Sequence, residues 1–108
     1  MKERIEKIAK ILDENKGENI ESFDLFESDY FVDGVVIATG LNEKHNEALL
    51  DFLKTGLKPE EEFLHVEVSD GWVVADLGDV LIHLMTEEYR KLYKLEDFLQ
   101  EFEARKNG

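Results

Sequence analysis

Cysteine is absent from this chain of 108 residues, so the protein forms no disulfide and carries no thiol chemistry. That absence suits a reducing compartment such as the cytosol. Long apolar runs are also missing, and no stretch approaches the roughly 20 residues that a membrane-spanning helix needs. The first residues, Met1 to Arg4, open a charged amphipathic segment and lack the apolar core of a secretory signal. We therefore expect a soluble, cytoplasmic protein with no membrane partner.

Basic residues are scarce as well. Thirteen Lys and Arg residues stand against 26 Asp and Glu residues, which leaves a net charge of −13. Nucleic-acid binding depends largely on cationic side chains that neutralise phosphates, so this charge argues against extensive contact with DNA or RNA. A basic protein partner would instead be attracted by the long-range field, faster at low ionic strength. The net charge fits a role in solubility equally well. Attraction of a basic partner and maintenance of solubility therefore both stay open.

What remains is the composition of a folded protein. Hydrophobic residues make up 43% and charged residues 36% of the chain, as in globular and not in disordered sequences. The length fits one domain, 1–108, with a single core. No repeat, linker or low-complexity segment divides the chain, and we expect its last residues, 104–108, to be frayed.

The spacing of apolar residues predicts alternating helices and strands. Helical patterns cover 4–15, 42–57 and the C-terminal part from a cap at Thr86 onward, with a bend near Lys94. Extended patterns indicate strands over 20–26, 30–39, 63–68, 72–77 and 79–85. This order predicts an α/β fold, a single domain with a mixed β-sheet of about five strands flanked by helices.

The segment from Asp70 to Tyr93 is the centre of this pattern. Asp70 and Gly71 form a turn signal, because glycine reaches the positive φ that tight turns need. The two strands on either side of Gly78 carry consecutive apolar residues, which is typical of strands covered on both faces. We therefore expect both strands in the middle of the sheet.

Asp76, Asp79 and His83 are the residues of this segment that could bind a metal. Carboxylate oxygens and an imidazole are suitable ligands. However, Asp79 and His83 are four residues apart on one strand, which separates them by roughly 13 Å. We therefore interpret His83 as a hydrogen-bonded sheet histidine. The two aspartates either fix the turn around Gly78 by binding backbone amides or make polar contacts with a partner.

Gly40, Asn42, Lys44 and His45 mark the start of a predicted helix, where free amides can bind an anion. A phosphate-binding loop needs more glycines than the single Gly40. We therefore interpret Asn42 as a helix cap and His45 as a core-facing side chain. The serines have no nearby His–acid pair in the sequence, so a catalytic triad has no specific support.

Trp72 is the strongest candidate for a protein-binding residue. It follows the turn at Gly71, where the sheet covers a large aromatic side chain only in part. Trp and Tyr are frequent in binding hot spots, because they bury much area at modest entropic cost. Tyr89 and Tyr93 lie one helical turn apart on the next helix and would extend the same patch. A plain core position for Trp72 at a strand start is the alternative.

An ordered set of short motifs resembles the ribosomal silencing factor family (RsfS, also called Iojap). It extends from about residue 20 to 99 in the family's order and spacing. Two features depart from the family pattern: about four residues are added around Asp33 to Val36, and Leu77 stands where an aromatic is common. The matching motifs are Asp29-Tyr30-Phe31-Val32, Ile37-Ala38-Thr39-Gly40 with His45, Asp70-Gly71-Trp72, Asp76-Leu77-Gly78-Asp79-Val80 with His83, and Tyr93-x-Leu95-Glu96.

The resemblance implies a fold with a nucleotidyltransferase-like core and a function without enzymatic activity or cofactor. It implies binding to the large ribosomal subunit through ribosomal protein uL-fourteen, a basic protein, and inhibition of small-subunit joining when nutrients are scarce. A homodimer in the absence of the ribosome is a further implied property. The partner-binding residues expected are Trp72, Asp76, Leu77, Asp79, Tyr89 and Tyr93.

Two other classes of function remain as alternatives. A nucleotide-binding or nucleotidyl-transferring enzyme would need metal-binding carboxylates, for which Asp76 and Asp79 are the candidates. A nucleic-acid mimic would need an ordered pattern of carboxylates, which the sequence does not show.

Overall fold

The computed structural model describes residues 1–105 as one α/β domain. The expected cap at Asn42 is confirmed, because its side chain accepts a hydrogen bond from the His45 backbone N–H at 2.8 Å at the start of the second helix. Thr86 precedes the third helix as expected, but its side chain makes no cap hydrogen bond. The elements in chain order are α1 (Lys2–Glu14), β1 (Glu18–Asp24), β2 (Gly34–Gly40), α2 (Glu43–Leu57), β3 (His65–Ser69), β4 (Trp72–Asp76), β5 (Val80–Thr86), α3 (Glu87–Tyr93) and α4 (Leu95–Arg105).

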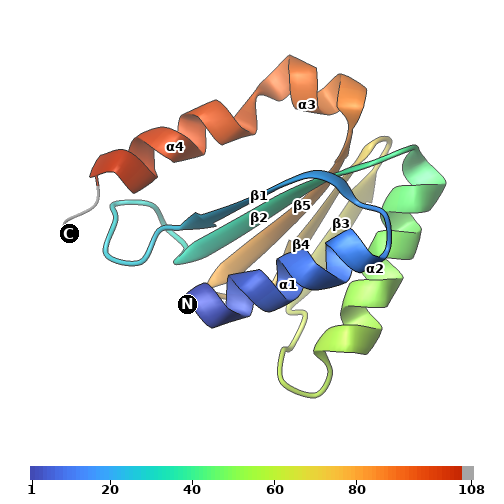
Figure 1. The fold of residues 1–108 in the computed structure, drawn as a ribbon, viewed down its shortest axis with the longest axis horizontal. Helices are drawn as coiled ribbons and strands as arrows, with labels where there is room; N and C mark the ends of the chain where they lie inside the picture. The colour runs from blue at the N-terminus through green and yellow to red at the C-terminus, as the bar shows by residue number, and fades with distance from the viewer. Residues whose placement is uncertain (106–108) are drawn as a thin grey trace.

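The five strands form one mixed sheet in the order β1-β2-β5-β4-β3 (Figure 1). Strands β2 and β5 are parallel, and every other neighbouring pair is antiparallel. The parallel pair is connected through α2 and the β3–β4 hairpin. The predicted mixed five-stranded sheet is therefore confirmed.

The helices form a layer on each face of the sheet. Helices α1 and α2 pack together against one face, whereas α3 and α4 lie on the opposite face over β1, β2 and β5 (Figure 1). An apolar cluster fills each interface. The first contains α1 and α2 residues such as Ile8 and Leu53, and the second includes Phe23 and Leu99.

The prediction that two strands are covered on both faces is confirmed for β5 and wrong for β4. In β5 every residue from Val80 to Met85 is buried. In β4 only Val73 and Ala75, which face α1 and α2, are buried. The other face of β4 is only half covered, since α3 and α4 contact β1, β2 and β5 on that side.

The predicted strand over 30–39 is shorter than expected. β2 begins at Gly34, and the residues before it form the loop from β1. In this loop the Tyr30 ring lies 5.0 Å from the Phe102 ring of α4, between centroids. Gly34 to Val36, part of the stretch that we expect to be added relative to the family pattern, form the first residues of β2 and pair with Val80 to Ile82 of β5.

The C-terminal helix is split, as the bend predicted near Lys94 indicated. Lys94 has φ 45° and ψ 46°, a left-handed conformation that ends α3 before α4 begins. α4 continues through Arg105, so Ala104 and Arg105 are helical and not frayed, and the rest of the predicted frayed end lies outside the described residues. None of the helices in the described part combines the length and apolar character needed to cross a membrane.

Candidate docking surface

Within residues 1–105, the helices leave one part of the sheet uncovered. The side chains of β3 and β4 on the α3–α4 side are exposed or half-buried, because α4 lies over β1 at the far edge. We call this surface the open face. Alternation along the two strands and their pairing assign to it His65, Glu67, Ser69, Trp72, Val74 and Asp76.

Trp72 stands at the end of the open face next to α3. Its indole is half-buried and its ring centroid lies 5.0 Å from that of Tyr93 and 6.5 Å from that of Tyr89. The Tyr89 and Tyr93 rings are 5.8 Å apart, as expected for residues one helical turn apart. We call these three residues the aromatic cluster. The structure thus brings together the three aromatic residues that the sequence suggested as one patch.

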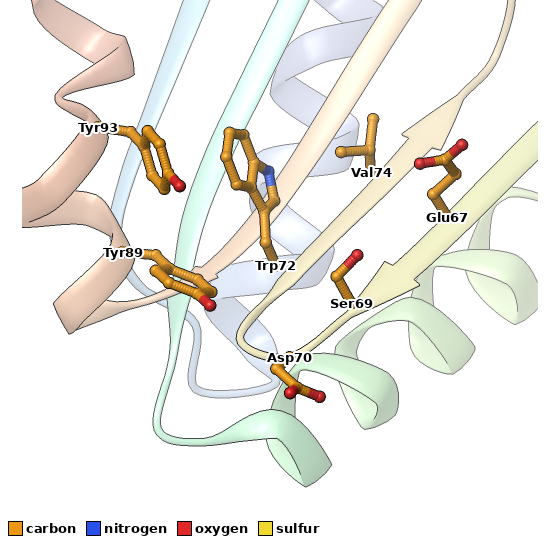
Figure 2. A pocket seen from close by; sticks show the side chains of 7 residues that line it. All are labelled: Glu67, Ser69, Asp70, Trp72, Val74, Tyr89 and Tyr93. Carbon is orange, nitrogen blue, oxygen red and sulfur yellow. The ribbon is translucent and has the colours of Figure 1, made fainter.

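A shallow pocket of about 360 Å³ opens beside the aromatic cluster. Figure 2 shows Tyr93 on one side of the indole, whereas Val74, Ser69 and Glu67 lie on the other. No Lys or Arg is among the described residues that line it, and Asp70 and Glu67 give it a negative rim. The surface is therefore aromatic at its centre and acidic at its edge.

The same negative character extends to the neighbouring end of α2. Asp70 raises the pKa of the exposed Glu43 carboxyl, chiefly through the repulsion between the two charges. Leu41, Glu87 and Glu88 line a second hollow next to these groups, together with Tyr89. Carboxylates thus surround the free amides at the α2 N-terminus, which argues against an anion there.

Asp76 lies on the open face but fulfils a structural role in the following turn. Its Oδ1 accepts a hydrogen bond from the Gly78 backbone N–H at 2.7 Å. Gly78 has φ +97°, a conformation that favours glycine. Asp76 lies roughly 13 Å along β4 from Trp72, at the usual rise per residue. The turn interpretation of Asp76 is therefore confirmed, and its contact with a partner stays a prediction.

Asp79 is directed away from the aromatic cluster toward α1. Its Oδ2 accepts a hydrogen bond from Arg4 Nη1 at 2.5 Å, and Arg4 also donates to Glu61. The bond from Arg4 lowers the pKa of the Asp79 carboxyl, and the two acidic partners raise that of the Arg4 guanidinium. Asp79 thus links the β4–β5 turn to α1 and to the loop before β3.

Leu77 requires a correction. Its side chain is 7% exposed and belongs to the apolar cluster beneath α1 and α2. A partner has no access to it in this conformation. The side chain is buried because Leu77 follows Val73 and Ala75 on the inner face of β4. Its position next to a turn does not make it a surface residue.

His83 is a buried sheet histidine, as interpreted from the sequence. It is 7% exposed, and desolvation lowers the pKa of its imidazole to about 4. Its Nδ1 accepts a hydrogen bond from Trp72 Nε1 at 3.1 Å. Within residues 1–105 no group of three or more His, Cys, Asp or Glu residues could hold a metal ion. The sequence contained a signal for the contact between Trp72 and His83. Counting outward from the turn at Gly78 places Val74 opposite His83, and Trp72 lies two residues from Val74 on the same face of β4.

His45 connects two helices and does not form part of a phosphate site. Its Nδ1 accepts a hydrogen bond from the Leu41 backbone N–H at 2.9 Å, and its Nε2 lies 3.1 Å from the Asn15 carbonyl oxygen. Because the N–H of Leu41 is a donor and the carbonyl is an acceptor, Nε2 carries the proton. The expected core-facing side chain is thus half-buried and joins the end of α1 to the start of α2.

Arg90 anchors the helix that carries Tyr89 and Tyr93, a role that no sequence motif indicated. The residue is 8% exposed, although arginine is rarely buried unless it is paired. Its guanidinium donates to the Asn19 carbonyl at 2.8 Å, the Thr39 hydroxyl at 2.9 Å, and the carboxylates of Glu21 and Glu96 at 2.9 and 3.3 Å. Arg90 therefore fixes α3, and with it both tyrosines, to β1 and β2. Only the tertiary contacts reveal this role, since the partners of Arg90 on β1 and β2 lie more than fifty residues away in the sequence.

Comparison with known proteins identifies the family. The family model "Ribosomal silencing factor during starvation" matches residues 1–107. Ribosomal silencing factor RsfS of Haemophilus influenzae is 32% identical over 95 residues, which cover 85% of this chain and 93% of the relative. RsfS of Bacillus subtilis is 28% identical over 93 residues, which cover 82% of this chain and 77% of the relative.

Two solved structures have the same fold. A protein from Chromobacterium violaceum superposes with a TM-score of 0.80 at 27% identity, covering 91% of this chain and 85% of that one. A protein from Bacillus halodurans gives a TM-score of 0.76 at 26% identity, covering 91% and 94%. Together with the family match over nearly the whole sequence, these likenesses show that the chain belongs to the ribosomal silencing factor family, RsfS.

Proposed function

We propose that this protein binds the large ribosomal subunit and blocks joining of the small subunit, so that translation falls when nutrients are limiting. The observation that carries the proposal is the family match over residues 1–107. The relatives from Haemophilus influenzae and Bacillus subtilis are named ribosomal silencing factors. A ribosome-bound factor of this kind acts in the cytoplasm.

The open face and the aromatic cluster are the proposed docking surface, and ribosomal protein uL-fourteen is the proposed partner. Trp72, Tyr89 and Tyr93 supply aromatic area of the kind that dominates hot spots. The net charge of −13 favours a basic protein over ribosomal RNA. The acidic rim at Glu67 and Asp70 would meet basic side chains on that protein.

Inhibition by this protein would be steric. The domain measures 38 × 34 × 23 Å, large enough to separate two surfaces that must come together. Such a mechanism requires no chemical step, only sufficient affinity and slow dissociation from the large subunit. Asp76 and Asp79, the carboxylates that a nucleotidyl-transferring enzyme would need, bind the Gly78 amide and the Arg4 guanidinium instead.

Sedimentation of ribosomal subunits tests the proposal. Purified protein added to separated subunits is expected to reduce the fraction of joined ribosomes on a sucrose gradient. The variant Trp72→Ala should lose both this effect and co-sedimentation with the large subunit. Phe31→Ala is a matched control, because Phe31 is an aromatic residue 75% exposed in the loop between β1 and β2. Unchanged joining with the wild-type protein would refute the function, and full binding by folded Trp72→Ala would exclude Trp72 from the interface.

A separate measurement addresses the enzymatic alternative. The thermal unfolding of the protein is compared with and without ATP and magnesium or manganese. If the protein acts only by binding the ribosome, ATP and the metal should leave its melting temperature unchanged, and the ATP should not be consumed. A clear stabilisation that Asp76→Asn abolishes, or turnover of the nucleotide, would favour the nucleotidyl-transferring enzyme.

We further propose that the free protein forms a homodimer, as the family resemblance implies. Light scattering over a range of concentrations is expected to give twice the chain mass of 12.6 kDa. A constant mass of one chain at all concentrations would contradict this.

A further inference from the structure

His83 lies directly beneath the proposed docking surface and contacts the only tryptophan on it. It is buried in β5, whereas Trp72, on the neighbouring strand β4, remains half-buried. Trp72 is the only tryptophan of the chain. A buried polar ring that contacts this one indole therefore affects the docking surface itself.

The contact crosses from one strand to the next. In the β4–β5 pairing Trp72 is opposite Met85 and Val74 is opposite His83, so His83 is the diagonal neighbour of Trp72 on the same face. The indole N–H donates to His83 Nδ1 at 3.1 Å, and the two ring centroids are 5.9 Å apart. Tyr93 contacts the indole from the other side, at 5.0 Å between centroids. These two contacts leave the side of the indole toward Val74 and Ser69 available (Figure 2).

The hydrogen bond has a clear chemical requirement. An indole N–H is a donor only, so the bond exists only while Nδ1 of the imidazole keeps its lone pair. Burial favours the neutral imidazole at neutral pH, since it lowers the pKa of His83. A buried apolar side chain at position 83 would leave the indole N–H without this acceptor, and the indole would be free to adopt other rotamers.

We propose that His83 is a positioning residue of the docking surface, whose Nδ1 holds the Trp72 indole in the orientation that a partner binds. This inference rests on the proposed function. A preorganised aromatic side chain favours binding because it does not have to be ordered when the partner binds. His83 itself makes no contact with the partner.

The expected effect follows from the population of the competent rotamer. When only a fraction of the molecules presents the indole correctly, the apparent Kd rises by the reciprocal of that fraction. The loss of one neutral hydrogen bond corresponds to an about three- to tenfold rise in Kd. The variants His83→Phe and His83→Leu both remove the acceptor and fill the space with apolar atoms, so one remains informative if the other fails to fold. His83→Asn keeps an acceptor near the position of Nδ1.

The first measurement needs no ribosome. The single indole N–H gives one resolved signal in a proton–nitrogen NMR spectrum of the free protein. In His83→Phe and His83→Leu this signal should move upfield and exchange faster with water, and His83→Asn should restore part of both properties. Met85→Leu is the control for altered packing, because Met85 is buried opposite Trp72 and has no hydrogen-bonding role toward it. Unchanged indole signals in the Phe and Leu variants would refute the proposal.

The second measurement is the affinity for isolated large ribosomal subunits. We expect the Kd to rise about three- to tenfold in His83→Phe and His83→Leu, to recover in part in His83→Asn, and to stay near wild type in Met85→Leu. Displaced indole signals with unchanged Kd would overturn the docking role of His83. If the wild-type protein bound no large subunits, the proposed function would fail, while the indole signals would still show whether His83 holds Trp72.

Discussion

The buried imidazole of His83 makes the stability of the fold depend on pH. Burial lowers its pKa to about 4, whereas a histidine in the unfolded chain titrates near the ordinary value of 6.5. Below about pH 6.5 the unfolded chain therefore takes up a proton that the folded protein resists. The stability from neutral His83 is fully present above that pH and is lost as the pH falls toward 4.

The size of this effect can be worked out from the two pKa values. One unit of pKa difference corresponds to about 1.36 kcal/mol. Between about pH 8 and pH 5, His83 alone should reduce the free energy of unfolding by about 2 kcal/mol. This range stays above the isoelectric point of about 4.5, where the protein loses its net charge.

Urea unfolding of the wild-type protein and of His83→Asn, at matched pH values, isolates this contribution. Both proteins share every other ionisable group, so the difference between their curves reports His83. The wild-type protein should lose about 2 kcal/mol more than the variant from about pH 8 to pH 5. Parallel curves would show that His83 titrates near its ordinary pKa and that burial does not lower this pKa in the folded protein.

Four substitutions test other parts of the structure by urea unfolding and by co-sedimentation with large subunits. Arg90→Leu should reduce stability by about 3 kcal/mol and weaken binding, because α3 loses its anchor. Leu77→Ala should cost about 3 kcal/mol by leaving a cavity, without changing the affinity of the folded protein. Asp79→Asn should cost about 1 kcal/mol or less and leave binding intact. Gly71→Ala should weaken binding, because its φ is +75° and a Cβ would lie 2.8 Å from the Tyr89 ring.

Each of these variants also has an outcome that would contradict its premise. Wild-type stability in Arg90→Leu would mean that α3 is held without the guanidinium. Weaker subunit binding by fully folded Leu77→Ala or Asp79→Asn would return those positions to the docking surface. Unchanged binding by Gly71→Ala would show that the position of Tyr89 is not critical.

The sequence predicted the order of the elements because their signals are local. Apolar spacing, the Asn42 cap and the turn glycines each act within a few residues. The pairing of Tyr89 with Tyr93 followed from helix periodicity in the same way, and the left-handed conformation of Lys94 confirms the bend expected there. The coverage of β4 could not be read locally, because it depends on where α3 and α4 lie across the sheet.

The candidate site was predictable in part for the same reason. Trp72 and the two tyrosines are grouped in space, whereas Asp79 pairs with Arg4 some seventy residues earlier in the chain. Leu77 is in the core because it continues the alternation of Val73 and Ala75 past the end of β4. Neighbouring residues of one motif, such as Asp76 and Leu77, thus lie on opposite faces of the sheet. Only the tertiary structure shows which of them is accessible to a partner.

The position of β3 at the edge of the sheet has a consequence for the behaviour of the protein in concentrated solution. In the described part of the chain β3 pairs with β4 alone, so its other side presents unpaired backbone groups that could join a second strand. The net charge of −13 on each copy opposes non-specific pairing of such edges, which lacks the complementary contacts of a specific interface. The acidity that would attract a basic partner thereby also protects the edge strand, and this protection disappears as the solution approaches the isoelectric point.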